Sequence, residues 1–198
     1  MGNFYLLNPS KGWAAVCIAK NACSSLKTAL LLDGGEEVPR SSKMALHERI
    51  GFTGKSPHLH PVGEGLEGDW VRFAVVRDPV ERFISAYRHF ALDGTYQYEL
   101  RDILSAPLEV WIEFAEVELR KPALLQDEHL RPQSSFFRRG DIDHLVPIRE
   151  LDSFFDEQGW PRLPRENSSR APCNPSPPQV ERIRWLYRAD LGLMDCER

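Results

Sequence analysis

Residues 70–88 read WVRFAVVRDPVERFISAYR and carry the clearest local structural signals in the chain. The first part of this segment is rich in β-branched and aromatic side chains, which favours a β-strand. A helix signal follows at once, because Asp78 is a good N-cap, Pro79 suits the first helical position and Glu81 completes a capping box. The pattern predicts a strand that passes directly into a helix, which runs from Pro79 to about Leu92.

Strand and helix signals alternate on both sides of this segment. Short apolar runs predict strands at residues 4–7, 13–18, 70–76 and 144–148. Helical patterns occur at residues 25–32, 41–50, 96–119 with an interruption at Pro107, 150–158 and 179–194. Residues 51–69 hold five glycines and two prolines and predict a loop. This alternation is typical of an α/β fold with a parallel sheet flanked by helices, which binds ligands at the carboxyl ends of its strands.

The composition is that of an ordinary globular protein. The 198 residues have a formal net charge of −4, whereas nucleic-acid binders normally present a basic face. No window offers ~18 consecutive apolar residues, so we expect no transmembrane segment. The first residues lack the basic and apolar regions of a secretory signal. We therefore expect one domain over residues 1–198, a cytoplasmic location and no nucleic-acid partner.

The first candidate site lies where the strand at 13–18 leads into a helix. Residues 18–27 read IAKNACSSLK. The backbone N–H groups of such a turn and the dipole of the helix that follows favour an anion. Lys20 adds a cation, and Ser24 and Ser25 add hydroxyl donors. The segment predicts an anion site, although an ordinary turn with capping serines stays an alternative.

The second candidate site is the junction after residue 76. Arg77 directly follows the strand, and Arg82 and Ser85 are three residues apart on the expected helix, so they share a face. An arginine before a helix and a serine two turns into it can bind one phosphate from two sides. Surface arginines on an amphipathic helix are the alternative for this segment taken by itself.

Together the two segments resemble the nucleotide-binding motifs of sulfotransferases that use 3′-phosphoadenosine 5′-phosphosulfate (PAPS). The resemblance is closest to carbohydrate sulfotransferases of the chondroitin and HNK-1 type and their bacterial relatives. Residues 19–27 are similar to the PKxACTxWK loop for the 5′-phosphosulfate, and residues 77–88 match the R[DE]PxER[LF]xSAYR segment for the 3′-phosphate. Residues 128–133, EHLRPQ, resemble a third stretch, EHWxP. Ala19, Leu26 and Leu130 depart from the proline and the tryptophans of these motifs.

The resemblance implies a sulfotransferase fold, with a P-loop-like parallel sheet, and in-line transfer of a sulfuryl group from PAPS to a hydroxyl. The acceptor is expected to be a sugar, a glycolipid or a small metabolite, and no metal is expected. The resemblance also implies a set of donor-binding residues: Lys20, Asn21, Ala22, Cys23, Ser24, Ser25, Arg77 and Ser85. Lys20 is in addition the expected catalytic cation, because its ammonium can meet the charge that develops on the leaving 5′-phosphate. Arg82 is a weaker candidate, since it can instead support Glu81 or a loop.

A general base should accept the proton of the acceptor hydroxyl, and histidine suits this task near neutral pH. His60 is the first candidate, because related heparan-type sulfotransferases have a catalytic histidine in this region. His129 and His58 follow, and Glu128 could also serve.

Two other functions stay open. A non-catalytic module could keep the fold and only bind PAPS or its product 3′,5′-ADP (PAP), and retention of Lys20 argues against it. A P-loop kinase is suggested by residues 51–56, GFTGKS, but the two glycines are separated by two residues where the phosphate-binding loop needs four.

Overall fold

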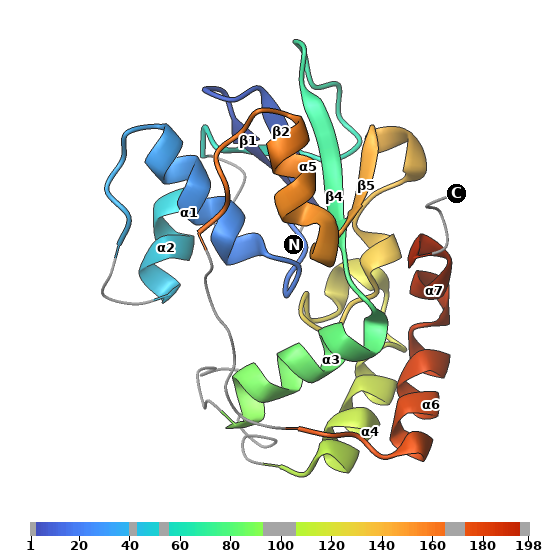
Figure 1. Ribbon diagram of the computed structural model, residues 1–198. Coiled ribbons are helices and arrows are strands. Elements are labelled where there is room, and N and C mark those ends of the chain that lie inside the picture. The colour runs from blue at the N-terminus through green and yellow to red at the C-terminus, as the bar shows by residue number, and fades with distance from the viewer. Residues whose placement is uncertain (1–2, 40–42, 52–55, 93–105, 165–172, 195–198) are drawn as a thin grey trace. The chain divides into compact units, whose positions relative to one another are not determined.

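The computed structural model describes residues 3–39, 43–51, 56–92, 106–164 and 173–194. The chain forms two compact units, each made from two parts of the sequence (Figure 1). The first unit comprises Met1–Val76 with Gln133–Asn167, and the second comprises Arg77–Pro132 with Ser168–Arg198. The expectation of a single domain stays a prediction. Within the described ranges, no helix has the length and apolar character needed to span a membrane.

The first unit is built around a five-stranded sheet with the order β3-β1-β2-β4-β5. β2, β4 and β5 run parallel, whereas β1 pairs antiparallel with both β2 and β3. The predicted α/β fold is confirmed, but the sheet is mixed rather than wholly parallel. The strands are β1 (Phe4–Asn8), β2 (Trp13–Val16), β3 (Leu59–Pro61), β4 (Val71–Val76) and β5 (His144–Pro147).

A tight turn explains why β1 and β2 are antiparallel. The backbone N–H groups of Lys11 and Gly12 donate to the carbonyl of Asn8 at 3.2 and 2.8 Å, and Gly12 has a φ of 68°. A connection this short can join only antiparallel strands, because parallel neighbours need a long crossover. β3 lies inside the predicted loop at 51–69, and its three residues are too few to produce a strand pattern in the sequence.

Three helices of the first unit share one hydrophobic core with the sheet. They are α1 (Cys23–Asp33), α2 (Lys43–Ile50) and α5 (Leu151–Glu157), and all three were expected from the sequence. α1 and α2 lie side by side in Figure 1. Trp13 of β2 and Phe73 of β4 are fully buried in this core, with ring centroids 6.0 Å apart. This packing fixes the carboxyl ends of the central strands, where the candidate residues follow.

The second unit is helical. Its α-helices are α3 (Pro79–Tyr87), α4 (Leu108–Glu118), α6 (Pro177–Leu186) and α7 (Arg188–Met194), and a π-helical turn, Arg88–Leu92, continues α3. The Asp78 carboxylate accepts hydrogen bonds from the N–H groups of Val80 and Glu81 at 2.9 and 3.0 Å, so the predicted N-cap is confirmed. The helix predicted at 179–194 is two helices, which meet at Tyr187. Residues 52–55, within the GFTGKS segment, and residues 96–105 of the predicted helix lie outside the described residues.

Candidate functional site

The loop between β2 and α1 has an unusual backbone. Lys20 and Ala22 have φ angles of 70° and 60°, and Ala22 is the N-cap of α1 in the left-handed conformation. Non-glycine residues rarely adopt this region, and each costs about 1–2 kcal/mol. Strain of this kind is typically found where a loop must present its groups in one arrangement. The loop is therefore held in its shape by its surroundings.

Asn21 supplies one of the contacts that hold the loop. Its side chain is 1% exposed, and its Nδ2 donates to the carbonyl of Val75 at 2.8 Å and to Oε1 of Gln133 at 2.5 Å. Asn21 thus connects the loop to β4 and to the short 3-10 helix Gln133–Ser135. Its side chain points into the protein, which makes it a positioning group for Lys20 and Ala22. Sequence reasoning missed Gln133, although it belongs to the EHLRPQ stretch.

The first turn of α1 provides donors for an anion. The first intrahelical bond of α1 runs from Leu26 N to Ala22 O, so the N–H groups of Cys23 and Ser24 precede the helical hydrogen-bond pattern. The first turn carries no acidic side chain. Cys23 and Ser24 are partly exposed, whereas Ser25 is 9% exposed. With the positive end of the helix dipole, this turn is suited to bind a phosphate or sulfate group.

Arg77 and Ser85 belong to the second unit. Arg77 precedes α3 and is partly exposed, and its Nε lies 3.3 Å from Oε2 of Glu81. Glu81 was expected to complete a capping box, and its carboxylate instead contacts Arg77. Ser85 lies two turns into α3 and is partly exposed. Both side chains are therefore accessible to a ligand.

Arg82 is a structural residue in this fold. It is 2% exposed, and its guanidinium donates to the carbonyls of Arg131 at 2.9 Å and Glu128 at 3.1 Å. Of the two roles expected for Arg82, support of a loop is the one that these contacts favour. Its position gave a signal, since Arg82 follows the helical spacing of the buried residues Pro79, Phe83 and Ala86.

His58 and His60 differ in their surroundings, although both lie near β3. His58 Nε2 is 3.1 Å from Oε1 of Glu36. His60 lies in β3 opposite Tyr5 of β1, and its Nε2 is buried with no hydrogen-bond partner among the residues that the structure describes.

His129 lies on the loop that Arg82 supports. Its Nδ1 is 2.9 Å from Oδ1 of Asp127, and the same oxygen accepts from the backbone N–H of His129 at 2.8 Å. The His129 ring packs edge-on against Phe90, with centroids 4.7 Å apart. Burial by itself would raise the pKa of Asp127, but hydrogen bonds from His129 and the charges of His129 and Arg82 hold that pKa below its usual value. Asp127 was not predicted from the sequence, because its role depends on contacts made in the folded loop.

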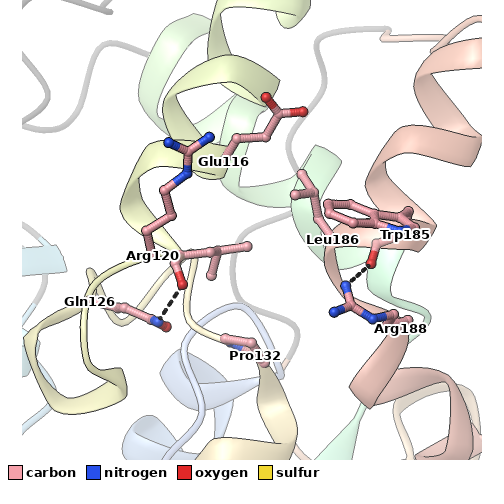
Figure 2. A pocket seen from close by; sticks show the side chains of 8 residues that line it. Glu116, Arg120, Gln126, Pro132, Trp185, Leu186 and Arg188 are labelled. Carbon is pink, nitrogen blue, oxygen red and sulfur yellow. Dashed lines mark hydrogen bonds between the residues drawn. The ribbon is translucent and has the colours of Figure 1, made fainter.

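The second unit also has a pocket of about 490 Å³. Figure 2 shows it between Glu116 and Arg120 on one side and Trp185, Leu186 and Arg188 on the other. The guanidinium of Arg188 lies over the indole of Trp185, 4.8 Å from the ring centroid. Within the described part of the chain, none of the residues predicted for the donor lines this pocket.

Comparison with protein families identifies the chain. The model of the sulfotransferase family matches residues 4–140, which include both candidate loops and the EHLRPQ stretch. No curated protein and no solved structure matches the chain. The family match covers more than half of the sequence, so the chain belongs to the sulfotransferase family.

Proposed function

We propose that this sulfotransferase uses PAPS as donor substrate and transfers its sulfuryl group to a hydroxyl of an acceptor, with carbohydrates as the favoured class. The observation that carries the proposal is the loop at 19–22. Its two left-handed residues lead into a helix whose first turn bears serine hydroxyls and no acidic side chain. A loop built in this way suits the multiply charged phosphosulfate end of the donor.

In this proposal the donor is bound at its two charged ends. The N–H groups of residues 22–25 and the hydroxyls of Ser24 and Ser25 bind the 5′-phosphosulfate. Arg77 and Ser85 bind the 3′-phosphate, and the guanidinium of Arg77 exchanges its contact with the exposed carboxylate of Glu81 for this phosphate. A surface ion pair of this kind contributes little free energy, about 0–1 kcal/mol, so the exchange is inexpensive.

The reaction is an in-line displacement at sulfur. The acceptor oxygen forms a bond to sulfur, the bond from sulfur to the 5′-phosphate oxygen breaks, and its electron pair stays on the phosphate of PAP. Lys20 stabilises the negative charge that develops on this leaving group. By analogy with phosphoryl transfer, catalysis comes mostly from positioning and from charge stabilisation. The acceptor proton passes to a general base, for which His60, His58, His129 and Glu128 were the candidates.

Replacement of Lys20 tests this function. We expect Lys20→Ala to lower kcat for transfer of ³⁵S-sulfate from labelled PAPS by about 10²–10³-fold, the usual effect of losing one group that stabilises charge in the transition state. Lys11→Ala, in the turn between β1 and β2, is the matched control and should keep the wild-type rate. Circular dichroism confirms that both variants are folded.

Calorimetric titration with PAP, ADP and ATP provides the second part of the test. We expect PAP to bind more tightly than ADP and ATP, and Arg77→Ala to abolish this preference, because the 3′-phosphate is the group that Arg77 recognises. Equal activity of Lys20→Ala and wild type would contradict the proposed catalytic role of Lys20. Binding of PAP without transfer to any acceptor would show a non-catalytic binding module instead.

A further inference from the structure

We propose that Asp127 is a positioning residue that orients His129 as the general base, an assignment that rests on the proposed sulfuryl transfer. The proposal starts from the pair itself. Oδ1 of Asp127 accepts hydrogen bonds both from the ring Nδ1 of His129, at 2.9 Å, and from its backbone N–H, at 2.8 Å. One carboxylate oxygen therefore fixes the main chain and the ring of the same residue.

The hydrogen bond also determines the tautomer of His129. An ionised carboxylate can only accept hydrogen bonds, so Nδ1 of His129 must be the donor. In the neutral ring the lone pair then lies on Nε2, and Nε2 is the atom that can accept a proton. A carboxylate that orients the base in this way is the arrangement by which serine hydrolases activate a hydroxyl.

The surroundings hold the pair from several directions. Arg82 donates to the carbonyl of Glu128, directly before His129, and to that of Arg131, two residues after it. The backbone N–H of Asp127 donates to Oε1 of Glu118 at 2.9 Å. These contacts come from α3 and α4, and together they fix the loop on both sides of His129.

His129 remains accessible at the same time. Its side chain is 15% exposed, whereas that of Asp127 is 8% exposed. The oriented pair is therefore sheltered on its carboxylate side and partly open at the ring, as a base that must meet an acceptor requires.

The other two histidines are less suited. Nε2 of His58 contacts the carboxylate of Glu36 at 3.1 Å, but that carboxylate is 26% exposed and also pairs with Arg49, whereas the Asp127 side chain is 8% exposed. Nε2 of His60 is buried and has no hydrogen-bond partner among the described residues. Among the described residues, His129 is the one of these three histidines with a partly exposed ring whose Nδ1 contacts a buried carboxylate, and its Nε2 lies 4.0 Å from Oε1 of Glu128.

The proton and electron movements follow from this geometry. The hydroxyl proton of the acceptor passes to Nε2 of His129, and the oxygen uses its electron pair to bond to sulfur. The bond from sulfur to the 5′-phosphate breaks, and PAP leaves with that electron pair. Asp127 keeps its charge throughout and stabilises the imidazolium that forms on His129.

Kinetics of three variants test the assignment, with ³⁵S-labelled PAPS as donor and a panel of 4-nitrophenyl glycosides as acceptors. We expect His129→Gln to lower kcat by about 10²–10⁴-fold, the usual contribution of a general base. Asp127→Asn should lower kcat at least tenfold while the dissociation constant for PAP stays unchanged. The double variant should be no slower than His129→Gln, because residues that act as a unit are not additive. Asp156→Asn, at an exposed ion pair with Arg162, is the control and should keep the wild-type rate.

Long-range ¹H–¹⁵N NMR of the histidine rings gives a readout that does not depend on the acceptor. The wild-type spectrum should show His129 protonated at Nδ1, and Asp127→Asn should shift the tautomer toward Nε2–H. Protonation of wild-type His129 at Nε2, or full kcat in His129→Gln, would overturn the assignment. A wild-type chain that shows the expected tautomer but transfers sulfate to no acceptor would instead contradict the proposed function.

Discussion

Replacement of Asn21 by alanine should destabilise the protein and disturb the loop that carries Lys20. The change removes two donations from a side chain that is 1% exposed, one to Val75 O at 2.8 Å and one to Gln133 Oε1 at 2.5 Å. Gln133 is itself fully buried. Each buried acceptor that loses its donor costs about 1–3 kcal/mol.

The two losses add up to about 2–6 kcal/mol, but one effect opposes them. Oδ1 of Asn21 is buried with no hydrogen-bond partner among the described residues, so its removal returns a desolvation cost of about 1 kcal/mol or more. We therefore expect Asn21→Ala to lower the free energy of unfolding by about 1–5 kcal/mol. This is a large part of the 5–15 kcal/mol that is typical of a whole domain.

Urea unfolding followed by circular dichroism measures this change, and two further variants sharpen it. Asn21→Asp should be worse than Asn21→Ala at pH 7, because its carboxylate would face two carbonyl oxygens. Gln133→Ala and the double variant with Asn21→Ala should reveal a coupling free energy of about 0.5–3 kcal/mol, as expected for residues in contact. A loss of less than about 0.5 kcal/mol in Asn21→Ala, the range of an ordinary surface change, would refute this reasoning.

Three further predictions concern the loop, a helix cap and alkaline pH. Lys20→Gly should be more stable than Lys20→Ala by about 0.5–1 kcal/mol in thermal unfolding, because φ is 70° and glycine tolerates this backbone; the opposite order would show that the loop relaxes. Asp78→Ala should lower the free energy of unfolding by about 1 kcal/mol in urea titrations, because α3 loses its N-cap. Asp78→Asn should keep most of this stability, because asparagine is also a good N-cap. Burial and the neighbouring charge of Asp141 raise the pKa of Tyr5 to about 12, so the unfolded phenol ionises first as the pH rises above 10. Stability should therefore fall between pH 10 and 12 in urea titrations, less so in Tyr5→Phe, and an identical decline in both proteins would contradict this role of Tyr5.

The strand and helix at residues 70–88 could be predicted because their signals are local. Asp78 and Pro79 specify the start of α3 through contacts with the next few residues, which do not depend on the rest of the fold. The positions of the two candidate loops could also be predicted from local signals, since each loop follows a strand pattern and precedes a helix pattern in the sequence.

The direction of β1 and the existence of β3 could not be predicted in this way. β1 pairs with β3 through residues that are far apart in the sequence, such as Tyr5 and His60. β3 itself has only three residues, which are too few to show the alternating pattern of a strand. The alternation of strands and helices therefore favoured a wholly parallel sheet, although β1 lies between β3 and β2 and is antiparallel to both.

Within the candidate site, residue types were easier to predict than the direction of side chains. Asn21 and Arg82 lie in the two motifs as expected, but both side chains point inward and support loops. Gln133 was missed because it contacts Asn21, which is far away in the sequence. Asp127 was missed although His129 is only two residues away, because the spacing alone does not show that the two side chains meet in the folded loop. Such roles follow from tertiary structure rather than from spacing.

A crystal structure of the chain with PAP bound would test the central claim most directly. We predict that the Lys20 ammonium contacts the 5′-phosphate, and that Arg77 and Ser85 contact the 3′-phosphate of the same PAP molecule. PAP bound at another place, or these three side chains in contact with no phosphate, would contradict the account.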